Sequence, residues 1–235
     1  MRLDNYLVEK NIVGSRNKAQ SIIKNSLVSV NESIILKSSF KVTEDDRVLV
    51  SDYKEYVSRS AYKLAYFLEE LQLNIKDKIA LDIGSSTGGF TQVLLENGVK
   101  EVSAVDVGRD QLHKTLKDDS RVFSYESCDI RKFHSDKSFE IVVSDVSFIS
   151  LLNIVDDVER LSTRDIILLF KPQFEVGREV KRDNHGVVLN KKAIEGAMKH
   201  FEESCDKRGW ELVLKSPSQL TGKEGNLEYC YYFKK

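Results

Sequence analysis

Apolar residues near the start of the chain recur three or four positions apart and then give way to short apolar runs. The spacing predicts two helices, and Ser15 has the side chain of an N-cap for the second one. Short runs at 27–30, 34–35 and 48–50 predict strands separated by polar turns. The sequence therefore predicts a small N-terminal module of two helices and a few strands. The apolar faces of the two helices consist of Leu3, Leu7 and Val8, and of Ala19, Ile22 and Ile23.

A different pattern follows a polar connector at residues 52–59. Residues 60–71 carry apolar side chains on one helical face, and from residue 78 short apolar runs alternate with amphipathic segments. This alternation is typical of an α/β fold of the Rossmann type, with a parallel sheet and helices on both faces. Strands are predicted at 79–82, 102–105, 122–124, 140–144, 165–170, 211–215 and 228–233, and helices at 60–71, 90–96, 111–116, 151–161 and 190–208.

The position of the charged residues along the chain is more informative than the overall composition. The 235 residues carry a net charge of -1, but residues 1–43 hold seven Lys or Arg against Asp4, Glu9 and Glu32, a local excess of +4. Such an excess is compatible with nucleic-acid contact. The three cysteines form no CxxC pair and the four histidines are scattered, so neither a disulfide framework nor a metal site is expected.

No apolar segment has the length of a membrane span. Residues 1–10 are charged and contain no apolar signal core. The longest strongly apolar run, 166–170, is far shorter than the roughly 20 residues that cross a bilayer. We therefore expect a cytoplasmic protein without stable membrane association.

Residues 82–90 form a glycine-rich turn between a predicted strand and a predicted helix. Phe90 occupies the position where a P-loop requires lysine, and Ser86 occupies the middle glycine position of a dinucleotide fingerprint. Asp82 at the strand end is unfavourable beside a pyrophosphate but suits an ammonium group. S-adenosylmethionine carries an ammonium and a sulfonium and no phosphate, so this cofactor fits best, and a nicotinamide cofactor remains a weaker alternative. The expected contacts are Asp82, Gly84, Ser85, Thr87, Gly88, Gly89 and Phe90.

Acidic residues also follow the next two predicted strands. Asp106 is placed to accept hydrogen bonds from ribose hydroxyls, and Asp129 is placed to accept one from an adenine amino group. Their neighbours Val107 and Ile130 are expected to contact the cofactor as well. A solvated carboxylate is the commoner fate of a single acid at a strand end. Three acids after three successive strands indicate a ligand site at the carboxyl edge of the sheet.

Two further charged residues follow the fourth and fifth strands of the predicted sheet. Asp145 comes after residues 140–144, and Lys171 comes after the apolar run 166–170. Both are therefore expected at the cofactor edge, and burial tends to lower the pKa of a lysine. An Asp–Lys pair in such a place is also compatible with a purely structural salt bridge.

Five motifs in a fixed order make the sequence recognisable. Together they resemble the TlyA family, bacterial ribosomal-RNA ribose methyltransferases related to the FtsJ/RrmJ enzymes. The segment from Met1-Arg2-Leu3-Asp4 through 28–31 resembles an S4 RNA-binding domain. The resemblance implies an S4-like domain and linker at 1–56 and a seven-stranded methyltransferase domain at 57–235. The motifs lie at 57–64, 82–90, 144–148, 170–175 and 225–229.

The resemblance also implies a set of catalytic residues: Lys63, Asp145, Lys171 and Glu228. The implied reaction is methylation of the ribose 2′-hydroxyl of a cytidine in the RNA of ribosomal subunits. A neutral Lys171 beside the cation Lys63 would serve as base or stabilise the developing alkoxide. The two acids, one of which also borders the cofactor, would orient the lysines. Ser60-Ala61 stands where related sequences often have two glycines.

Basic residues suggest where RNA is held. The loop 177–186 follows the fifth strand, beside the expected active edge, and phosphate contacts position nucleic acids. A charged loop is usually only solvated, and for a basic residue on the N-terminal helix face solvation and RNA contact are about equally expected. The candidate contacts are Arg2, Arg16, Lys18, Arg59, Arg178, Lys181 and Arg182.

Two other functions remain open from the sequence. One is a non-catalytic RNA-binding protein with a vestigial methyltransferase fold, against which the complete set of four residues argues. The other is membrane lysis, because members of the family have been labelled haemolysins. The absence of a long amphipathic segment disfavours direct lysis.

Overall fold

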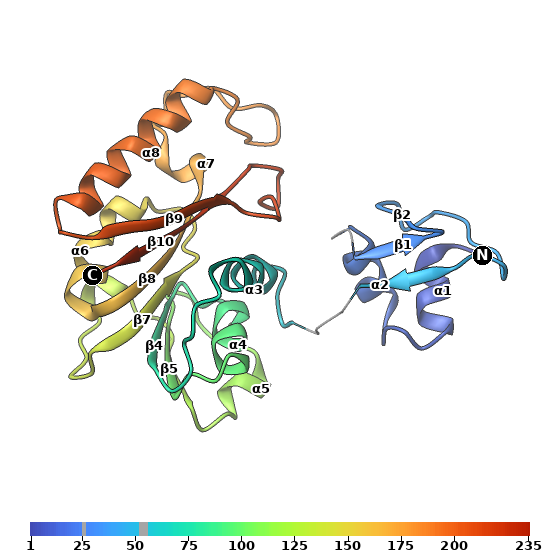
Figure 1. Ribbon diagram of the computed structural model, residues 1–235, viewed down its shortest axis with the longest axis horizontal. Coiled ribbons are helices and arrows are strands. Elements are labelled where there is room, and N and C mark those ends of the chain that lie inside the picture. Colours follow the sequence, from blue (N-terminus) through green and yellow to red (C-terminus); the bar gives the residue numbers. More distant parts are fainter. Residues whose placement is uncertain (25–26, 52–55) are drawn as a thin grey trace. The chain divides into compact units, whose positions relative to one another are not determined.

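The computed structural model describes residues 1–24, 27–51 and 56–235. The chain divides into two compact units, Met1–Glu55 and Tyr56–Lys235 (Figure 1). Part of the connector predicted at 52–59, residues 52–55, lies outside the described residues.

The N-terminal unit has the two helices and short strands that the sequence predicts. Ser15 Oγ accepts a bond of 3.3 Å from the backbone N–H of Lys18 and so caps the second helix. The predicted helix faces form the core, in which Leu3, Leu7 and Ile23 are fully buried. The elements are α1 (Leu3–Glu9), α2 (Arg16–Lys24) and an antiparallel sheet in the order β2 (Ser33–Ile34), β1 (Val28–Val30), β3 (Val48–Val50).

The C-terminal unit is built on a seven-stranded sheet in the order β6-β5-β4-β7-β8-β10-β9. The five strands from β6 to β8 in this order are parallel to one another, but β10 runs antiparallel to both β8 and β9. The prediction of a wholly parallel sheet is therefore wrong for β10, which pairs with both neighbours in the antiparallel direction. The strands are β4 (Ile79–Ile83), β5 (Glu101–Val105), β6 (Val122–Tyr125), β7 (Phe139–Ser144), β8 (Ser162–Phe170), β9 (Glu211–Pro217) and β10 (Tyr229–Lys234).

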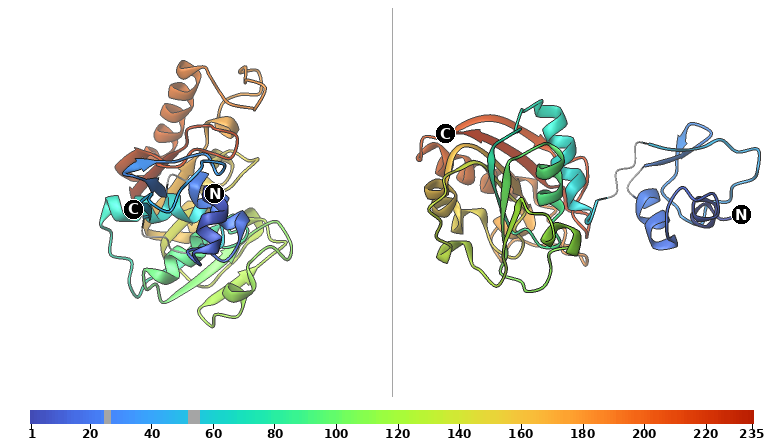
Figure 2. Two further views of the ribbon diagram at one scale, coloured as in Figure 1. Left: turned by 90° about the vertical axis from the view of Figure 1, so that its right-hand side faces the viewer. Right: turned by 90° about the horizontal axis from the view of Figure 1, so that it is seen from below.

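Helices cover both faces of this sheet (Figures 1 and 2). On one face α3 (Ser60–Leu71), α4 (Gly89–Glu96) and α5 (Lys114–Lys117) close one buried apolar cluster. On the other face α6 (Val155–Leu161) and α8 (Lys191–Asp206) close a second one. Burial on both faces explains why the central strands read as nearly continuous apolar runs in the sequence.

Three helical segments differ from the prediction. The helix predicted at 111–116 starts later, because Gln111 and Leu112 donate their N–H groups to Glu126 Oε1 at 2.8 and 3.0 Å. The helix predicted at 151–161 is divided into the 3-10 turn η2 (Leu151–Asn153) and α6. A short helix, α7 (Pro172–Glu175), begins with proline at its first turn and was not expected. A further 3-10 turn is η1 (Ile130–Lys132).

The chain order reverses at β4, which has β5 on one side and β7 on the other. In open sheets of this kind ligands bind at such a reversal, outside the carboxyl ends of the strands. The backbone joins the loops there. Val105 O accepts from Gly84 N at 2.9 Å, and Ile83 O accepts from Asp145 N at 3.2 Å.

Candidate active site

The glycine turn after β4 is tightly enclosed. Gly84 has φ +79°, and a Cβ at this position would lie 3.2 Å from the Cα of Val146. A Cβ at Gly89 would clash with Ser58 Oγ and lie 2.8 Å from Ser60 Oγ. The two glycines thus allow the turn to fit between the segment before α3 and the loop after β7.

A cavity of about 620 Å³ opens beside this turn, at the carboxyl edge of the sheet. A smaller cavity of about 150 Å³ adjoins it and shares Gly84, Ser86, Asp145 and Ser147. Of the predicted cofactor contacts, Gly84, Asp106, Val107, Asp129, Ile130 and Asp145 line the larger cavity, and Gly84, Ser85, Thr87, Phe90 and Asp145 line the smaller one. Asp82, Gly88 and Gly89 line neither cavity.

Asp82 is fully buried at the end of β4. Its Oδ2 accepts a bond of 2.6 Å from Thr91 Oγ1, while Oδ1 has no hydrogen-bond partner in the part of the chain that the structure describes. Burial, together with the nearby Asp145, raises the pKa of Asp82 to about 7. A buried acceptor without a partner is costly unless a ligand or water satisfies it.

Asp106 and Asp129 lie on the wall of the larger cavity. The two oxygens of Asp106 accept from Gly108 N at 2.6 Å and from Ser86 N at 2.8 Å, which fixes the carboxylate at the cavity edge. Asp129 is held by Arg131, whose Nη2 donates at 2.6 Å. This contact lowers the pKa of Asp129 to about 2, so the group is a carboxylate at neutral pH.

The chemistry of the wall fits S-adenosylmethionine. The charged residues on the described lining are three acids and Arg131, and that arginine is engaged with Asp129. A diphosphate would meet mostly negative charge there, whereas an ammonium and a sulfonium would meet carboxylates. The buried, unpartnered oxygen of Asp82 adds an acceptor behind the turn.

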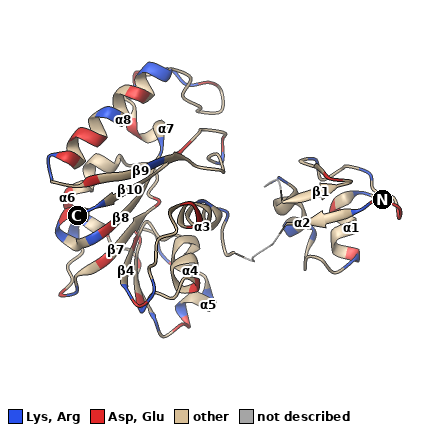
Figure 3. Ribbon diagram, viewed as in Figure 1, with Lys and Arg blue, Asp and Glu red and all other residues tan. Residues whose placement is uncertain are grey.

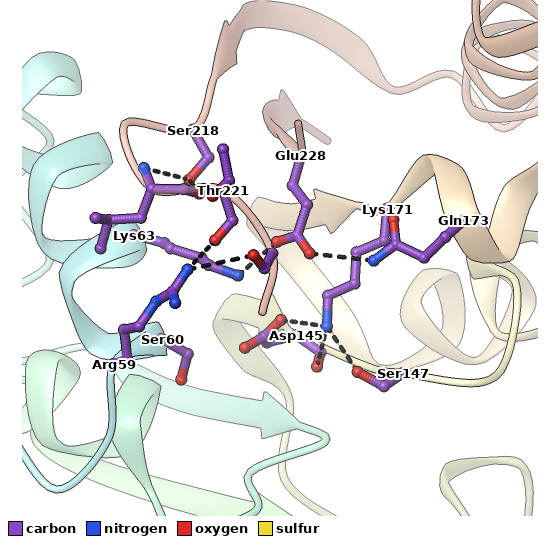
Figure 4. A network of polar contacts seen from close by, with 12 residues as sticks. Arg59, Ser60, Lys63, Asp145, Ser147, Lys171, Gln173, Ser218, Thr221 and Glu228 are labelled. Atoms are coloured by element: carbon purple, nitrogen blue, oxygen red, sulfur yellow. Dashed lines mark hydrogen bonds and ion pairs between the residues drawn. The ribbon is translucent and has the colours of Figure 1, made fainter. Parts of the chain in front are cut away.

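Two ion pairs stand beside the cavities (Figure 4). In the first, Lys171 Nζ lies 2.7 Å from Asp145 Oδ1 and donates to the backbone oxygen of Asp145 at 3.2 Å and to Ser147 Oγ at 2.8 Å. Lys171 follows β8 and Asp145 follows the adjacent strand β7, so strand pairing brings them together. Lys171 is buried, and its Nζ donates hydrogen bonds to Asp145 O and Ser147 Oγ beside its ion pair with the Asp145 carboxylate.

The second ion pair joins Lys63 of α3 with Glu228, the residue before β10. Both side chains are buried, with exposed fractions of 8% and 3%. Gln173 Nε2 donates to the other oxygen of Glu228 at 3.3 Å. The antiparallel direction of β10 is what brings its first residues to the carboxyl edge of β8, where Tyr229 pairs with Phe170. The structure thus assembles all four residues of the predicted set as two pairs.

The predicted RNA contacts occupy several different environments. Arg59 donates to the backbone oxygens of Thr221 and Gly222, and so ties the start of α3 to the loop before Glu228 (Figure 4). Arg182 donates to the backbone oxygens of Val180 and Gln173. Arg178 and Lys181 are exposed in the loop after α7, and Lys18 is partly exposed on α2. Arg2 and Arg16 bond the buried Asp4 of the N-terminal unit.

Sequence reasoning missed several residues of the site. Ser58 and Ser60 line the smaller cavity, and their hydroxyls are 2.8 Å apart. Ser147 and Phe148 line the larger one. These residues stand inside the recognised motifs, so the motif bounds contained the signal, but only the fold shows which side chains face the cavity.

The fold and the cavity define a methyltransferase that uses S-adenosylmethionine. The family pattern of FtsJ-like methyltransferases matches residues 56–235, and that of the S4 domain matches residues 1–48. The chain belongs to the TlyA family, in which an S4 domain precedes an FtsJ-like methyltransferase domain.

Relatives of the chain are similar over nearly their full length. A Campylobacter jejuni protein named 23S rRNA (cytidine-2'-O)-methyltransferase TlyA is 45% identical, covering 99% of each chain. A Mycobacterium tuberculosis 16S/23S rRNA (cytidine-2'-O)-methyltransferase TlyA is 32% identical, covering 99% of this chain and 89% of its own. A Brachyspira hyodysenteriae protein named hemolysin A is 37% identical, covering 99% of each chain.

Solved structures agree with this fold. A structure from Streptococcus thermophilus described as a hemolysin covers 100% of this chain and 88% of its own, with a TM-score of 0.74 and 31% identity. A magnesium protoporphyrin IX methyltransferase from Synechocystis, solved with its methyl donor, has a TM-score of 0.51 at 10% identity, covers 75% of this chain and 78% of its own, and shows the fold alone. Within the described residues, no helix is long and apolar enough to span a membrane.

Proposed function

We propose that this chain methylates the ribose 2′-hydroxyl of a cytidine in ribosomal RNA, within ribosomal subunits. The observation that carries the proposal is the presence of two ion pairs at the edge of the cofactor cavity, the partly buried Lys171–Asp145 and the buried Lys63–Glu228. The relatives named for cytidine-2'-O-methylation of ribosomal RNA support the choice of substrate. Because the proposed substrate is the ribosomal subunit, we expect the protein to act in the cytoplasm.

The reaction joins a hydroxyl oxygen to a methyl carbon and needs one proton removed. When bound, S-adenosylmethionine supplies the methyl group on a sulfonium, a good leaving group. The 2′-hydroxyl is a weak nucleophile that must be aligned and deprotonated. Lys171 Nζ is held by Asp145 and Ser147 at the cavity edge. Its ammonium form stabilises the developing alkoxide, and a neutral form would accept the proton. Such assistance is typically worth about 10²–10⁴-fold in rate.

The second pair has a positioning function in this scheme. Glu228 fixes the ammonium of Lys63 and is itself held by Gln173. The cation of Lys63 would orient the ribose oxygens and add positive potential where negative charge develops. Lys63, Glu228 and Lys171 are buried and Asp145 is partly buried, so the fields of these pairs are less screened than those of surface pairs.

Several exposed groups at the site suit RNA. Phe148 at the rim of the larger cavity exposes 92% of its surface, and unpaired bases stack on exposed aromatic rings. Arg178 and Lys181 lie exposed in the loop after α7 and would contact phosphates. Charges of both signs alternate along α8, so that helix offers no uniformly basic surface (Figure 3).

The test is methyl transfer from labelled S-adenosylmethionine to isolated ribosomal subunits, followed by mass-spectrometric mapping of ribose methylation. Wild-type protein is expected to label a cytidine 2′-oxygen, and Lys171→Ala is expected to lose at least about 10²-fold in rate. Lys199→Ala, on the exposed face of α8, is the matched control and should retain full activity. Activity retained in Lys171→Ala would refute the assigned role. Cofactor binding without any methyl transfer would favour a non-catalytic RNA-binding function.

A further inference from the structure

The loop between β7 and η2, residues 145–150, forms one wall of the larger cavity. Asp145, Val146, Ser147, Phe148 and Ile149 all line it. The loop therefore carries both an acid of the first ion pair and the exposed aromatic residue at the rim. Its conformation decides where these two side chains stand relative to the cofactor.

The first end of the loop is anchored by Lys171. That side chain contacts the carboxylate and backbone oxygen of Asp145 and the hydroxyl of Ser147. These contacts leave the following residues, from Phe148 onward, without support from the lysine.

The second end of the loop is anchored by Glu175, the last residue of α7. Its Oε2 accepts a bond of 2.6 Å from Ser150 Oγ, and its Oε1 accepts a bond of 2.9 Å from Leu151 N. Ser150 Oγ in turn accepts from Leu152 N at 3.1 Å and caps η2. One carboxylate thus determines where the loop ends and where η2 begins.

Between the two anchors the backbone takes an unfavourable conformation. Phe148 has φ +65°, in the left-handed region that residues with a side chain rarely adopt. Phe148 exposes 92% of its surface, and its ring centroid lies 5.2 Å from that of Phe174 in α7. Such a conformation persists only where the surroundings enforce it. The enforcement comes from Lys171 on one side and from Glu175 on the other.

Glu175 is not needed for charge balance. No lysine or arginine of the described ranges forms an ion pair with it, and burial raises the pKa of its carboxyl group. A partly buried acid that only binds a hydroxyl and a backbone N–H costs free energy that an apolar residue would not. The two carboxylate oxygens of Glu175 bind two consecutive residues, Ser150 and Leu151, which indicates that Glu175 fixes the conformation of the loop.

We propose that Glu175 is a positioning residue for the reaction: through Ser150 and Leu151 it holds Phe148 and Ser147 in the geometry that receives the target nucleotide. The proposal rests on the proposed function, since it concerns the RNA side of that same site. Glu175 touches no reacting atom. It acts on the loop alone, while Lys171, four residues earlier, acts on the loop and on the reaction.

The experiment compares Glu175→Ala, Glu175→Gln and Ser150→Ala with wild type in steady-state methylation of ribosomal subunits. Glu175→Ala is expected to reduce kcat/KM for RNA by about 10²-fold, the usual effect of a misplacement near 1 Å. Glu175→Gln retains a carbonyl acceptor for Leu151 N and an amide for Ser150, and should recover most of the activity. The matched control is Glu195→Ala on exposed α8.

Two further measurements separate positioning from general destabilisation. Hydrogen exchange at Leu151 should accelerate in Glu175→Ala, while exchange in β4 and β8 stays at the wild-type rate. In the double variant Glu175→Ala with Ser150→Ala, the losses should be less than additive, because both changes remove the same contact.

The outcomes are distinct from those that test the proposed function. If wild type methylates RNA and Glu175→Ala does so with unchanged kcat and KM, the positioning role is refuted. It is also refuted if Glu175→Gln is as poor as Glu175→Ala while both remain folded. If wild type itself transfers no methyl group, the proposed function fails, and accelerated exchange at Leu151 would still show that Glu175 holds the loop.

Discussion

Lys171 and Asp145 form an ion pair of 2.7 Å directly after two adjacent parallel strands. The register pairs Ser144 of β7 with Leu168 of β8, so the two strands end at the same edge of the sheet. The pairing of β7 with β8 therefore brings the two residues together, and their side chains need not reach across a long distance to form the ion pair. A site that is fixed by strand pairing loses little conformational entropy when substrate binds.

Variants of the buried pair Lys63–Glu228 should show its contribution to stability separately from its contribution to activity. Glu228→Ala leaves a buried ammonium without its partner, which is expected to cost about 3–5 kcal/mol of unfolding free energy. The double variant Lys63→Met with Glu228→Leu should recover much of this loss but remain inactive. Urea denaturation and methylation assays on the same preparations test this. A double variant that regains activity would contradict the assigned role of the pair.

The binding of S-adenosylmethionine should depend on pH through Asp82. Its pKa is raised to about 7 by burial, so below that pH the acid must lose a proton before it can accept from an ammonium. We expect affinity to increase as pH rises toward about 8, by up to about tenfold per unit below the pKa. Calorimetry in buffers with different ionisation enthalpies would detect the released proton. Asp82→Asn should bind weakly and without this dependence, and a pH-independent wild type would exclude the contact.

The same raised pKa affects stability in the opposite direction. The folded protein keeps a proton on Asp82 that the unfolded chain loses above the ordinary value of 3.8. The contribution of this group to stability is therefore greatest below about pH 4 and declines until about pH 7. Denaturation of the cofactor-free protein should show a smaller decline over this range in Asp82→Asn than in wild type.

Gly89 should tolerate no side chain. A Cβ there would clash with Ser58 Oγ and lie 3.1 Å from the backbone nitrogen of Ala61, so the segment before α3 would have to move. Since Ser58 and Ser60 line the smaller cavity, Gly89→Ala is expected to weaken cofactor binding at least about tenfold. The control is Gly196→Ala, because Gly196 lies on the exposed face of α8 and a Cβ there would meet open space. Equal cofactor affinity in wild type and Gly89→Ala would show that the segment can shift freely.

The N-terminal unit should contribute electrostatic affinity for RNA. Arg16 exposes 54% of its side chain while its Nε donates to the buried Asp4 at 3.0 Å, so its guanidinium is held at the surface. Arg16→Ala should weaken binding to ribosomal subunits and reduce the slope of log K against log salt by about 1. Lys207→Ala on the C-terminal end of α8 is the control. An unchanged slope would mean that Arg16 makes no phosphate contact.

Much of this architecture is encoded locally. The alternating pattern predicts the succession of strands and helices along the chain, and it predicts helix Ser60–Leu71 to the residue. It also predicts that the acids at the ends of β4 to β7 lie at one edge: Asp82, Asp106, Asp129 and Asp145. These predictions succeed because buried parallel strands appear as short apolar runs and amphipathic helices have a strong periodicity.

The remaining features depend on contacts between distant segments. The direction of β10 is set by its pairing with β8, and α7 is too short for any periodicity to reveal it. The start of α5 is delayed by Glu126, which lies beyond the helix in the sequence. Arg59 was expected on RNA by its charge, yet its guanidinium binds backbone oxygens of the loop before Glu228. Local patterns carry no information on such partners.

The pairing of Lys63 with Glu228 connects residues that are 165 positions apart. During synthesis, α3 emerges first and its lysine has no carboxylate to bind until Glu228 and the strand after it have been made. On the proposed mechanism, a nascent chain therefore carries no competent site until the segment that contains Glu228 has been synthesised. The separation of the two residues along the chain thus makes the site one of the last features of this domain to form during synthesis.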